Sequence, residues 1–242
     1  LKIAQGPFIL NLMRNLFKIT FIIGIVFFDF GQAIAEVNYS NLSIPKVHYK
    51  GGQYSPYPSA VDSLLGHVGR RTSIEVNRRP LQMKLSHPNL YQYPFIYMAG
   101  SDSFEPLPLN ELRRLRNYLS YGGFLLIDDN SSKANSKFDT SIRKMIRDLF
   151  PQVPLTKISR DHSIFRSFYL INRVTGRRKG NSYLEGINIK GRTALIYSTN
   201  DLGGAWARDK LGQWTKSIIN GGSSERQLTI RLGVNIVMYA LT

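Results

Sequence analysis

Acidic side chains follow two stretches that are predicted to be buried strands. Asp128 and Asp129 come directly after the apolar run 124–127, and Ser101 and Asp102 follow a second such run. In an open parallel sheet, ligands bind beyond the carboxyl ends of the strands. A carboxylate there could bind a hard cation, or act as a base if a neighbouring acid raised its pKa. Successive strand residues point to opposite faces, so we expect Asp128 and Asp129 not to share one site; alternatively, they cap the strand end.

The pair Asp161-His162 is predicted to lie in another loop at this edge. A carboxylate beside an imidazole is common at metal sites and in acid–base catalysis. In the alternative interpretation, Asp161 caps a turn that begins at His162 and the imidazole is structural. A metal-assisted hydrolase would need His162 near Asp128 or Asp129, and its single histidine would favour magnesium, manganese or calcium. The sequence otherwise indicates no cofactor.

Small and polar residues complete the predicted edge of the sheet. Gly51 and Gly52 follow the first strand and suggest a phosphate-binding turn, although the chain has neither a dinucleotide-binding nor a Walker pattern. Asn200 and Asp201 follow the last strand.

Arg231 lies on the C-terminal helix. Its long side chain predicts a polar strut, in which the guanidinium group reaches the carboxylate of Asp201. The alternative is a solvated polar face.

Both tryptophans lie in the glycine-rich stretch 199–224, among several basic residues. Trp206 and Trp214 could form a lid or a platform on which a carbohydrate or peptide stacks. The alternative is packing against the edge of the sheet.

The elements that must position these residues alternate between strands and helices. Residues 95–130 have the pattern of one βαβ unit, with Asn110 as the N-cap of its helix and Gly122 as the stop. Helical spacing predicts helices over 59–71, 110–121, 137–150 and 226–241. Strands are predicted over 44–49, 73–76, 81–85, 95–99, 124–127, 155–158, 184–189 and 193–198, the last two as a hairpin around Lys190-Gly191. This alternation predicts one α/β domain over 36–242, in three αβα layers around a mostly parallel, doubly wound sheet.

Residues 1–35 have the pattern of an N-terminal extension with a signal peptide. Met13 precedes two basic residues, the apolar run 19–28 and Ala33-Ile34-Ala35, a site of the kind that signal peptidase cleaves. The run is shorter than the roughly 20 residues that span a bilayer. We therefore expect an exported protein, periplasmic or extracellular; the alternative is a retained membrane anchor.

The chain is strongly basic, with 32 Lys and Arg against 16 Asp and Glu in 242 residues. The basic residues are scattered and accompany no nucleic-acid motif, so we expect no nucleic-acid partner. An envelope protein or an anionic surface, with peripheral membrane contact, fits the charge better. The chain has no cysteine, which excludes disulfides and thiolate sites.

Several ordered segments resemble one known family. They are Tyr91-Gln92-Tyr93-Pro94-Phe95, Leu115-Arg116-Asn117-Tyr118-Leu119, Gly122-Gly123-Phe124-Leu125, Asp128-Asp129, Phe150-Pro151, Asp161-His162-Ser163-Ile164-Phe165, Asn200-Asp201 and Arg231-Leu232-Gly233-Val234-Asn235. Together they resemble the bacterial domain of unknown function 4159 over roughly 47–241.

This resemblance implies an envelope-associated protein with a flavodoxin-like fold, similar to class I glutamine amidotransferases. It brings no catalytic residues. The chain also departs from that group, because it lacks the cysteine nucleophile that the amidotransferases use. Ser163 stands where relatives often have proline after the Asp-His pair. We therefore expect a module that binds a ligand or a partner protein, with the metal-assisted hydrolase as the alternative and a structural scaffold as a third.

Overall fold

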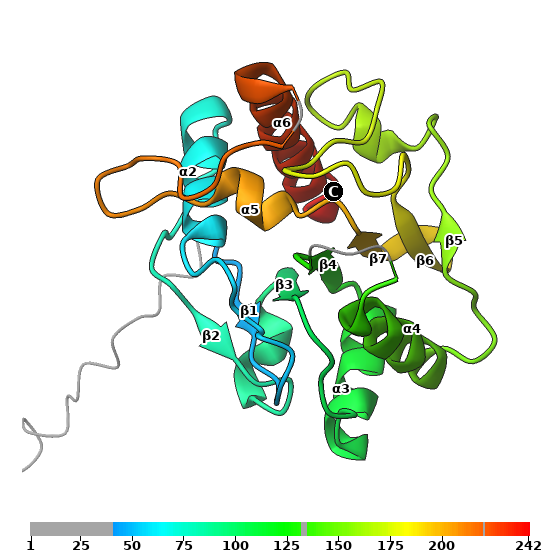
Figure 1. Ribbon diagram of the computed structural model, residues 1–242. Helices are drawn as coiled ribbons and strands as arrows, with labels where there is room; N and C mark the ends of the chain where they lie inside the picture. Colours follow the sequence, from blue (N-terminus) through cyan, green and yellow to red (C-terminus); the bar gives the residue numbers. More distant parts are fainter. Residues whose placement is uncertain (1–40, 132–134, 220) are drawn as a thin grey trace, which may run out of the picture. The chain divides into compact units, whose positions relative to one another are not determined.

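The computed structural model describes residues 41–131, 135–219 and 221–242, which belong to one compact unit, Ser40–Thr242 (Figure 1). The predicted signal peptide lies outside the described residues. Within them, no helix has both the length and the apolar character needed to cross a bilayer.

The sheet has seven strands in the order β2-β1-β3-β4-β7-β6-β5. Their bounds are β1 Lys46–Val47, β2 Gln82–Met83, β3 Phe95–Gly100, β4 Phe124–Asp129, β5 Thr156–Lys157, β6 Glu185–Ile189 and β7 Arg192–Ser198. The first five in this spatial order are parallel, whereas β6 pairs antiparallel with both β7 and β5. The parallel part has the flavodoxin-like order, in which the direction of strand succession reverses between β1 and β3.

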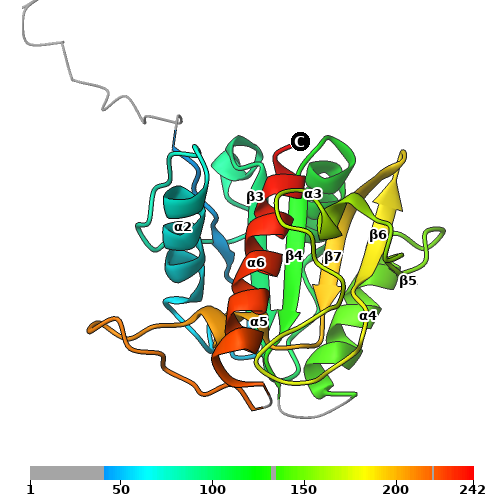
Figure 2. The ribbon, with the colours of Figure 1, turned by 90° about the horizontal axis from the view of Figure 1, so that it is seen from above.

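Helices cover both faces of the sheet, which gives the three layers that the sequence predicted (Figure 2). The helices are α2 Ala60–Arg71, α3 Leu109–Ser120, α4 Lys137–Leu149, α5 Leu202–Trp206 and α6 Gly222–Ala240. One apolar core lies between the sheet and α2, α5 and α6, and a second lies between the sheet and α3 and α4. All six residues of β3 and all six of β4 are buried, as expected for strands covered on both faces.

Most predicted elements are present, with local differences. Pro108, and not Asn110, is the N-cap of α3, while Gly122 follows the helix with a φ of 113° and confirms the predicted stop. The predicted strand 73–76 contributes a single bridge, from Val76 to Leu42. The hairpin is confirmed, and Lys190 takes a left-handed conformation at its turn.

Candidate functional site

Asp128 lies near the carboxyl end of β4 and is completely buried. Its carboxylate accepts four hydrogen bonds. The donors are the Tyr97 hydroxyl at 2.9 Å, the Asn130 side-chain amide at 2.7 Å, and the backbone N–H groups of Leu202 at 2.9 Å and Gly203 at 2.7 Å. These bonds join the end of β4 to the first turn of α5.

Asp201 faces Asp128 from the start of α5, in a left-handed conformation with a φ of 57°. Its Oδ1 accepts hydrogen bonds from the N–H of Gly204 at 3.1 Å and from the Asn130 amide at 2.8 Å. Its Oδ2 is paired with the guanidinium of Arg177, and Arg178 Nε lies 3.7 Å away. The strut that the sequence predicted between Arg231 and Asp201 is therefore wrong.

The two carboxyl groups perturb each other. Burial and the charge of Asp201 together raise the pKa of Asp128 to about 7. Burial also raises the pKa of Asp201, and the Arg177 guanidinium opposes that rise. Both carboxyl groups are completely buried, and Asp128 is therefore expected to keep its proton up to a pH of about 7.

Asp129 points to the opposite face of the sheet, as the alternation of strand residues predicted. Its Oδ1 accepts a hydrogen bond from the N–H of Ser131 at 2.7 Å, and its Oδ2 accepts one from the Ser136 hydroxyl at 2.7 Å. Ser136 in turn caps α4 by accepting a hydrogen bond from the N–H of Asp139 at 2.9 Å. Asp129 thus fixes the connection from β4 to α4, which agrees with the capping alternative.

The structure separates Asp161 and His162 from these carboxylates. His162 Nε2 lies 3.0 Å from the hydroxyl of Thr193 near the start of β7, and its ring packs on Tyr239 near the end of α6. Asp128 is level with Ser198 at the other end of β7, about 16 Å away along the strand at 3.3 Å per residue. The arrangement that the alternative, a metal-assisted hydrolase, would require of His162 and Asp128 is therefore not formed. His162 itself, and not Asp161, caps a short 3₁₀ helix by accepting a hydrogen bond from the N–H of Ile164.

The remaining candidates away from the strand ends have packing roles. Trp206 is fully buried in the core, where its indole N–H donates to the carbonyl of Thr229 at 3.1 Å, so it forms no lid. The guanidinium carbons of Arg208 and Arg226 lie 3.4 and 4.3 Å from the centroid of the Trp214 ring. Arg231 is exposed and lies over the ring of Tyr169.

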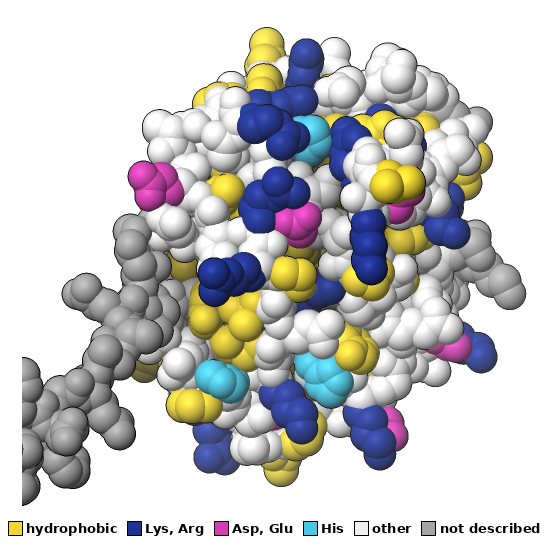
Figure 3. All heavy atoms as spheres, turned by 90° about the vertical axis from the view of Figure 1, so that its left-hand side faces the viewer, with side chains coloured by type: hydrophobic (Ala, Val, Ile, Leu, Met, Phe, Trp, Pro, Cys, Tyr) yellow, Lys and Arg dark blue, Asp and Glu magenta, His cyan; other side chains and the backbone are white. Residues whose placement is uncertain are grey.

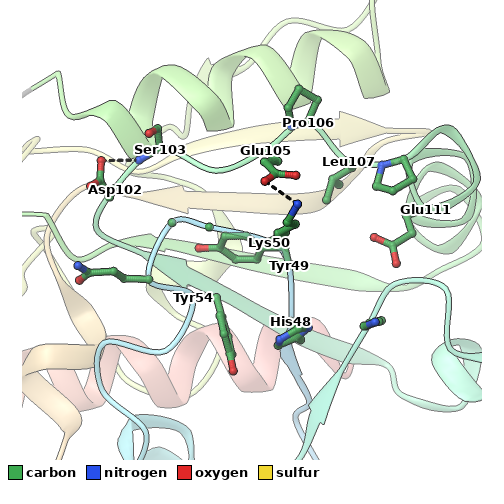
Figure 4. A pocket seen from close by; sticks show the side chains of 15 residues that line it. His48, Tyr49, Lys50, Tyr54, Asp102, Ser103, Glu105, Pro106, Leu107 and Glu111 are labelled. Atoms are coloured by element: carbon green, nitrogen blue, oxygen red, sulfur yellow. Dashed lines mark hydrogen bonds and ion pairs between the residues drawn. The ribbon is translucent and has the colours of Figure 1, made fainter.

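An open pocket of about 700 Å³ lies beside the carboxyl ends of β1 and β3, where the strand order reverses (Figure 4). We call it the switch-point pocket. Its lining includes Gly51, Gly52 and Asp102, three of the predicted ligand-binding candidates. Ser101 lies next to it and donates a hydrogen bond to the side chain of Gln53 at 2.8 Å.

Glycine conformations shape the floor of the switch-point pocket. Gly51 and Gly52 have φ values of 84° and 68°, and a Cβ on Gly52 would lie 2.6 Å from the ring of Tyr49. Gly100 at the end of β3 is equally restricted, because a Cβ there would lie 2.3 Å from the Tyr49 hydroxyl. The glycine pair therefore serves a tight turn over an aromatic ring, for which no residue but glycine fits.

Aromatic and charged side chains surround this floor (Figure 4). The rings of His48 and Tyr54 meet edge to face with their centroids 4.4 Å apart. Lys50 forms an ion pair with Glu105 at 2.9 Å at the exposed rim. Glu111 accepts a hydrogen bond from the Ser86 hydroxyl at 2.8 Å. The pocket thus combines aromatic rings with side chains of both charges.

A metal site is not assembled among the described residues: no three His, Asp or Glu side chains there come close enough to share an ion.

Several residues around Asp128 and Asp201 were not singled out from the sequence. Tyr57, Tyr97 and the pair Arg177-Arg178 come from loops or strands far along the chain from Asp128. Only the basic run that contains Arg177 and Arg178 gave a signal, and that signal was charge alone.

Asn200 holds the loop above the strand ends. Its side chain donates a hydrogen bond to the carbonyl of Asn181 at 3.0 Å, and it is almost completely buried. It does not line the switch-point pocket.

Comparison with known proteins identifies the family but gives no activity. No curated protein matches the chain. The family model described as "Domain of unknown function (DUF4159)" matches residues 35–241, which include every described helix and strand. The chain therefore belongs to the DUF4159 family.

Proposed function

We propose that this chain is a binding module whose ligand occupies the switch-point pocket. The observation that carries the proposal is the coincidence of an open pocket of about 700 Å³ with the reversal of strand order between β1 and β3. Open α/β sheets bind their ligands at this position, and a pocket of this size accommodates a small molecule. The turn at Gly51-Gly52, which packs closely on Tyr49, supports a pocket that exists before the ligand arrives.

The lining supports an uncharged or zwitterionic ligand with an apolar part. His48 and Tyr54 offer ring faces for stacking, and Leu107 adds aliphatic surface. The charged groups of the lining carry both signs, with Lys50 held by Glu105. A short peptide or a sugar has the matching combination of polar groups and flat or apolar surface.

Binding is better supported than catalysis. Asp128 and Asp129 accept hydrogen bonds from several groups of the chain itself, which gives both a structural role. The metal-assisted hydrolase would require the imidazole of His162, which lies near the opposite end of β7. The relationship to glutamine amidotransferases rests on the resemblance alone, and the chain lacks the cysteine of that chemistry.

We also propose that the protein is exported and works at the bacterial envelope. The support is the signal-like pattern before Glu36 and the basic surface, on which Lys and Arg outnumber acidic residues (Figure 3). N-terminal sequencing of protein from its native host should find a chain that begins near Glu36. Retention of Met13 would instead show an uncleaved anchor.

Binding of the protein to anionic vesicles should weaken as the salt concentration rises, because exposed charges are screened within about 8 Å at physiological ionic strength.

The ligand proposal is tested by a melting-temperature screen with amino acids, dipeptides and monosaccharides. At least one probe should raise the melting temperature in proportion to its concentration. Tyr54→Ala should abolish that shift. Tyr121→Ala is the matched control, because Tyr121 is 81% exposed at the end of α3, outside the pocket lining. A screen without any shift, or a shift that Tyr54→Ala leaves unchanged, would contradict the proposal.

A further inference from the structure

Residues of the segment 172–182 line a second hollow, which shares no lining residue with the switch-point pocket. One part, of about 400 Å³, has in its lining Arg160, Arg173, Arg178 and Lys179; we call it the cationic cavity. The neighbouring part, of about 240 Å³, is lined mainly by Ile158, Phe165, Ile171, Val174 and Tyr183; we call it the apolar cavity. Four residues, Arg160, Arg173, Val174 and Ser182, line both, so the two cavities adjoin.

The charges of the cationic cavity are not balanced. Glu225 is the one acid in its described lining, and Arg173 already binds that carboxylate through both of its terminal nitrogens, at 2.9 and 2.6 Å. Arg160 and Lys179 form no ion pair within the described part of the chain. An excess of positive charge therefore surrounds this hollow.

Arg178 adds a weakly satisfied guanidinium to the lining of the cationic cavity. Its side chain is only 13% exposed, and its Nε has no hydrogen-bond partner. The ion pair that this Nε forms with Asp201 is long, at 3.7 Å, and the same carboxylate oxygen also pairs with Arg177. Buried guanidinium groups normally have their donors satisfied, so this side chain can still gain from an anion in the cavity.

Close backbone packing fixes the wall of the cationic cavity. A Cβ on Gly176 would lie 2.0 Å from the carbonyl oxygen of Asn200, and one on Gly180 would lie 2.3 Å from that of Thr199. The N–H of Arg178 also donates to the carbonyl of Asn200 at 3.2 Å. The segment that carries the cations is thus pressed against the end of β7, and little ordering is left to occur when a ligand binds.

We propose that the two cavities together bind an amphipathic anion. Its phosphate or carboxylate head would lie in the cationic cavity near Arg160, Arg178 and Lys179. A short alkyl or aromatic group would fill the apolar cavity, against Phe165 and Ile171. Each part contributes separately: the head forms charge-assisted hydrogen bonds, and the apolar group removes hydrocarbon surface from water.

Calorimetric titration of the purified protein with four probes tests this site. Hexyl phosphate and hexanoate carry both parts, inorganic phosphate carries only the head, and hexanol carries only the chain. We expect one or both amphipathic probes to bind at least tenfold more tightly than inorganic phosphate or hexanol. Tighter binding of hexyl phosphate than of hexanoate assigns the head as a phosphate, and the reverse order assigns it as a carboxylate.

Variants separate this site from general basic charge. Arg160→Gln should weaken the better amphipathic probe about tenfold or more, as the loss of one charge-assisted contact does. Arg147→Gln is the matched control, since Arg147 is exposed on α4 and forms no ion pair within the described residues. Tyr54→Ala in the switch-point pocket should also leave this binding unchanged, which separates the two sites. Equal binding by hexanol, no binding by either amphipathic probe, or no effect of Arg160→Gln would overturn the proposal.

Discussion

Asp128 and Asp201 share one amide. The side-chain nitrogen of Asn130 donates to Oδ2 of Asp128 at 2.7 Å and to Oδ1 of Asp201 at 2.8 Å. The amide thus uses both of its hydrogens to hold together two acids that would otherwise repel each other in a buried space. Arg177 supplies the opposite charge on the far side of Asp201. This arrangement allows two neighbouring buried carboxyl groups at the end of the sheet.

Asp128 should make the stability of the protein depend on pH. Its pKa in the fold is about 7, well above the ordinary value of an aspartate, because of burial and the charge of Asp201. Below about pH 4 it is protonated in both the folded and the unfolded chain. Between about pH 4 and 7 the folded chain holds a proton that the unfolded chain releases. The free energy of unfolding should therefore fall as pH rises, by up to about 1.4 kcal/mol per pH unit.

Urea unfolding of the original protein and of Asp128→Asn at pH 5 and pH 8 checks this dependence. The variant cannot titrate at this position, so the stability advantage of the original protein should be larger at pH 5 than at pH 8. Asp148→Asn, on the exposed surface of α4, is the control and should change little at either pH. A constant difference between the original protein and Asp128→Asn would contradict the raised pKa.

Asp129 and Ser136 should be energetically coupled. Asp129→Asn weakens the charge-assisted bond to the Ser136 hydroxyl, and we expect it to cost about 1–2 kcal/mol of unfolding free energy. Ser136→Ala removes the N-cap of α4 and should cost about 1 kcal/mol. Chemical denaturation of both single variants and the double variant measures the coupling, which we expect to be about 0.5–1 kcal/mol. Strict additivity would show that Asp129 acts independently of the cap.

Gly176→Ala should destabilise the protein. The added Cβ would meet the backbone oxygen of Asn200, which cannot rotate away, so the segment would have to move at a cost of about 1–3 kcal/mol. Gly66→Ala in α2 is the matched control. There the nearest atoms belong to the flexible side chain of Arg78, and the better helix propensity of alanine should stabilise by up to about 1 kcal/mol. Melting temperatures that change in the same direction for both variants would refute the packing argument.

Asn235, and not Arg231, should be the important polar residue of α6. The Asn235 side chain accepts a hydrogen bond from the N–H of Tyr169 at 2.7 Å and donates to the carbonyls of Tyr169 and Ile164, each at 2.8 Å. Asn235→Ala would leave three inward-facing backbone groups unpaired and should cost on the order of 3 kcal/mol. Arg231→Ala, at an exposed position, should remain within about 0.5 kcal/mol of the original protein in denaturant unfolding. The opposite ranking would restore the strut that the sequence suggested.

The helices and strands that could be predicted well from the sequence are those with a strong local pattern of apolar and polar residues. The apolar runs 95–99 and 124–127 are buried strands because both faces of the sheet are covered by helices. The turn at Lys190-Gly191 was predictable because two β-patterned runs flank it. Helix α5 was missed because five residues, two of them glycine, are too short for a helical period. Its position is fixed by the carboxylates of Asp128 and Asp201, which lie outside the helix.

In the candidate site, too, some residues could be placed from the neighbouring sequence, whereas others are placed by contacts with distant parts of the chain. Asp128 and the Gly51-Gly52 turn could be placed near the strand ends because Asp128 follows the apolar run 124–127 and the glycines follow the predicted strand 44–49. His162 could not be placed, since the loop after β5 folds back toward the start of β7, and no local pattern indicates that return. The choice of Arg177 over Arg231 as the partner of Asp201 depends on tertiary packing in the same way.

The bonds at Asp128 also bear on when this fold can form. Two of its four donors, the N–H groups of Leu202 and Gly203, lie 74 and 75 residues further along the chain. A nascent chain that ends before residue 203 would therefore contain all of β4 but would have to bury its carboxylate without those partners. Contacts over such sequence distances also slow folding, because a long loop must close first. The central strands should therefore reach their final state only after residue 203 has been synthesised, so that this step of folding must wait for the segment that carries α5.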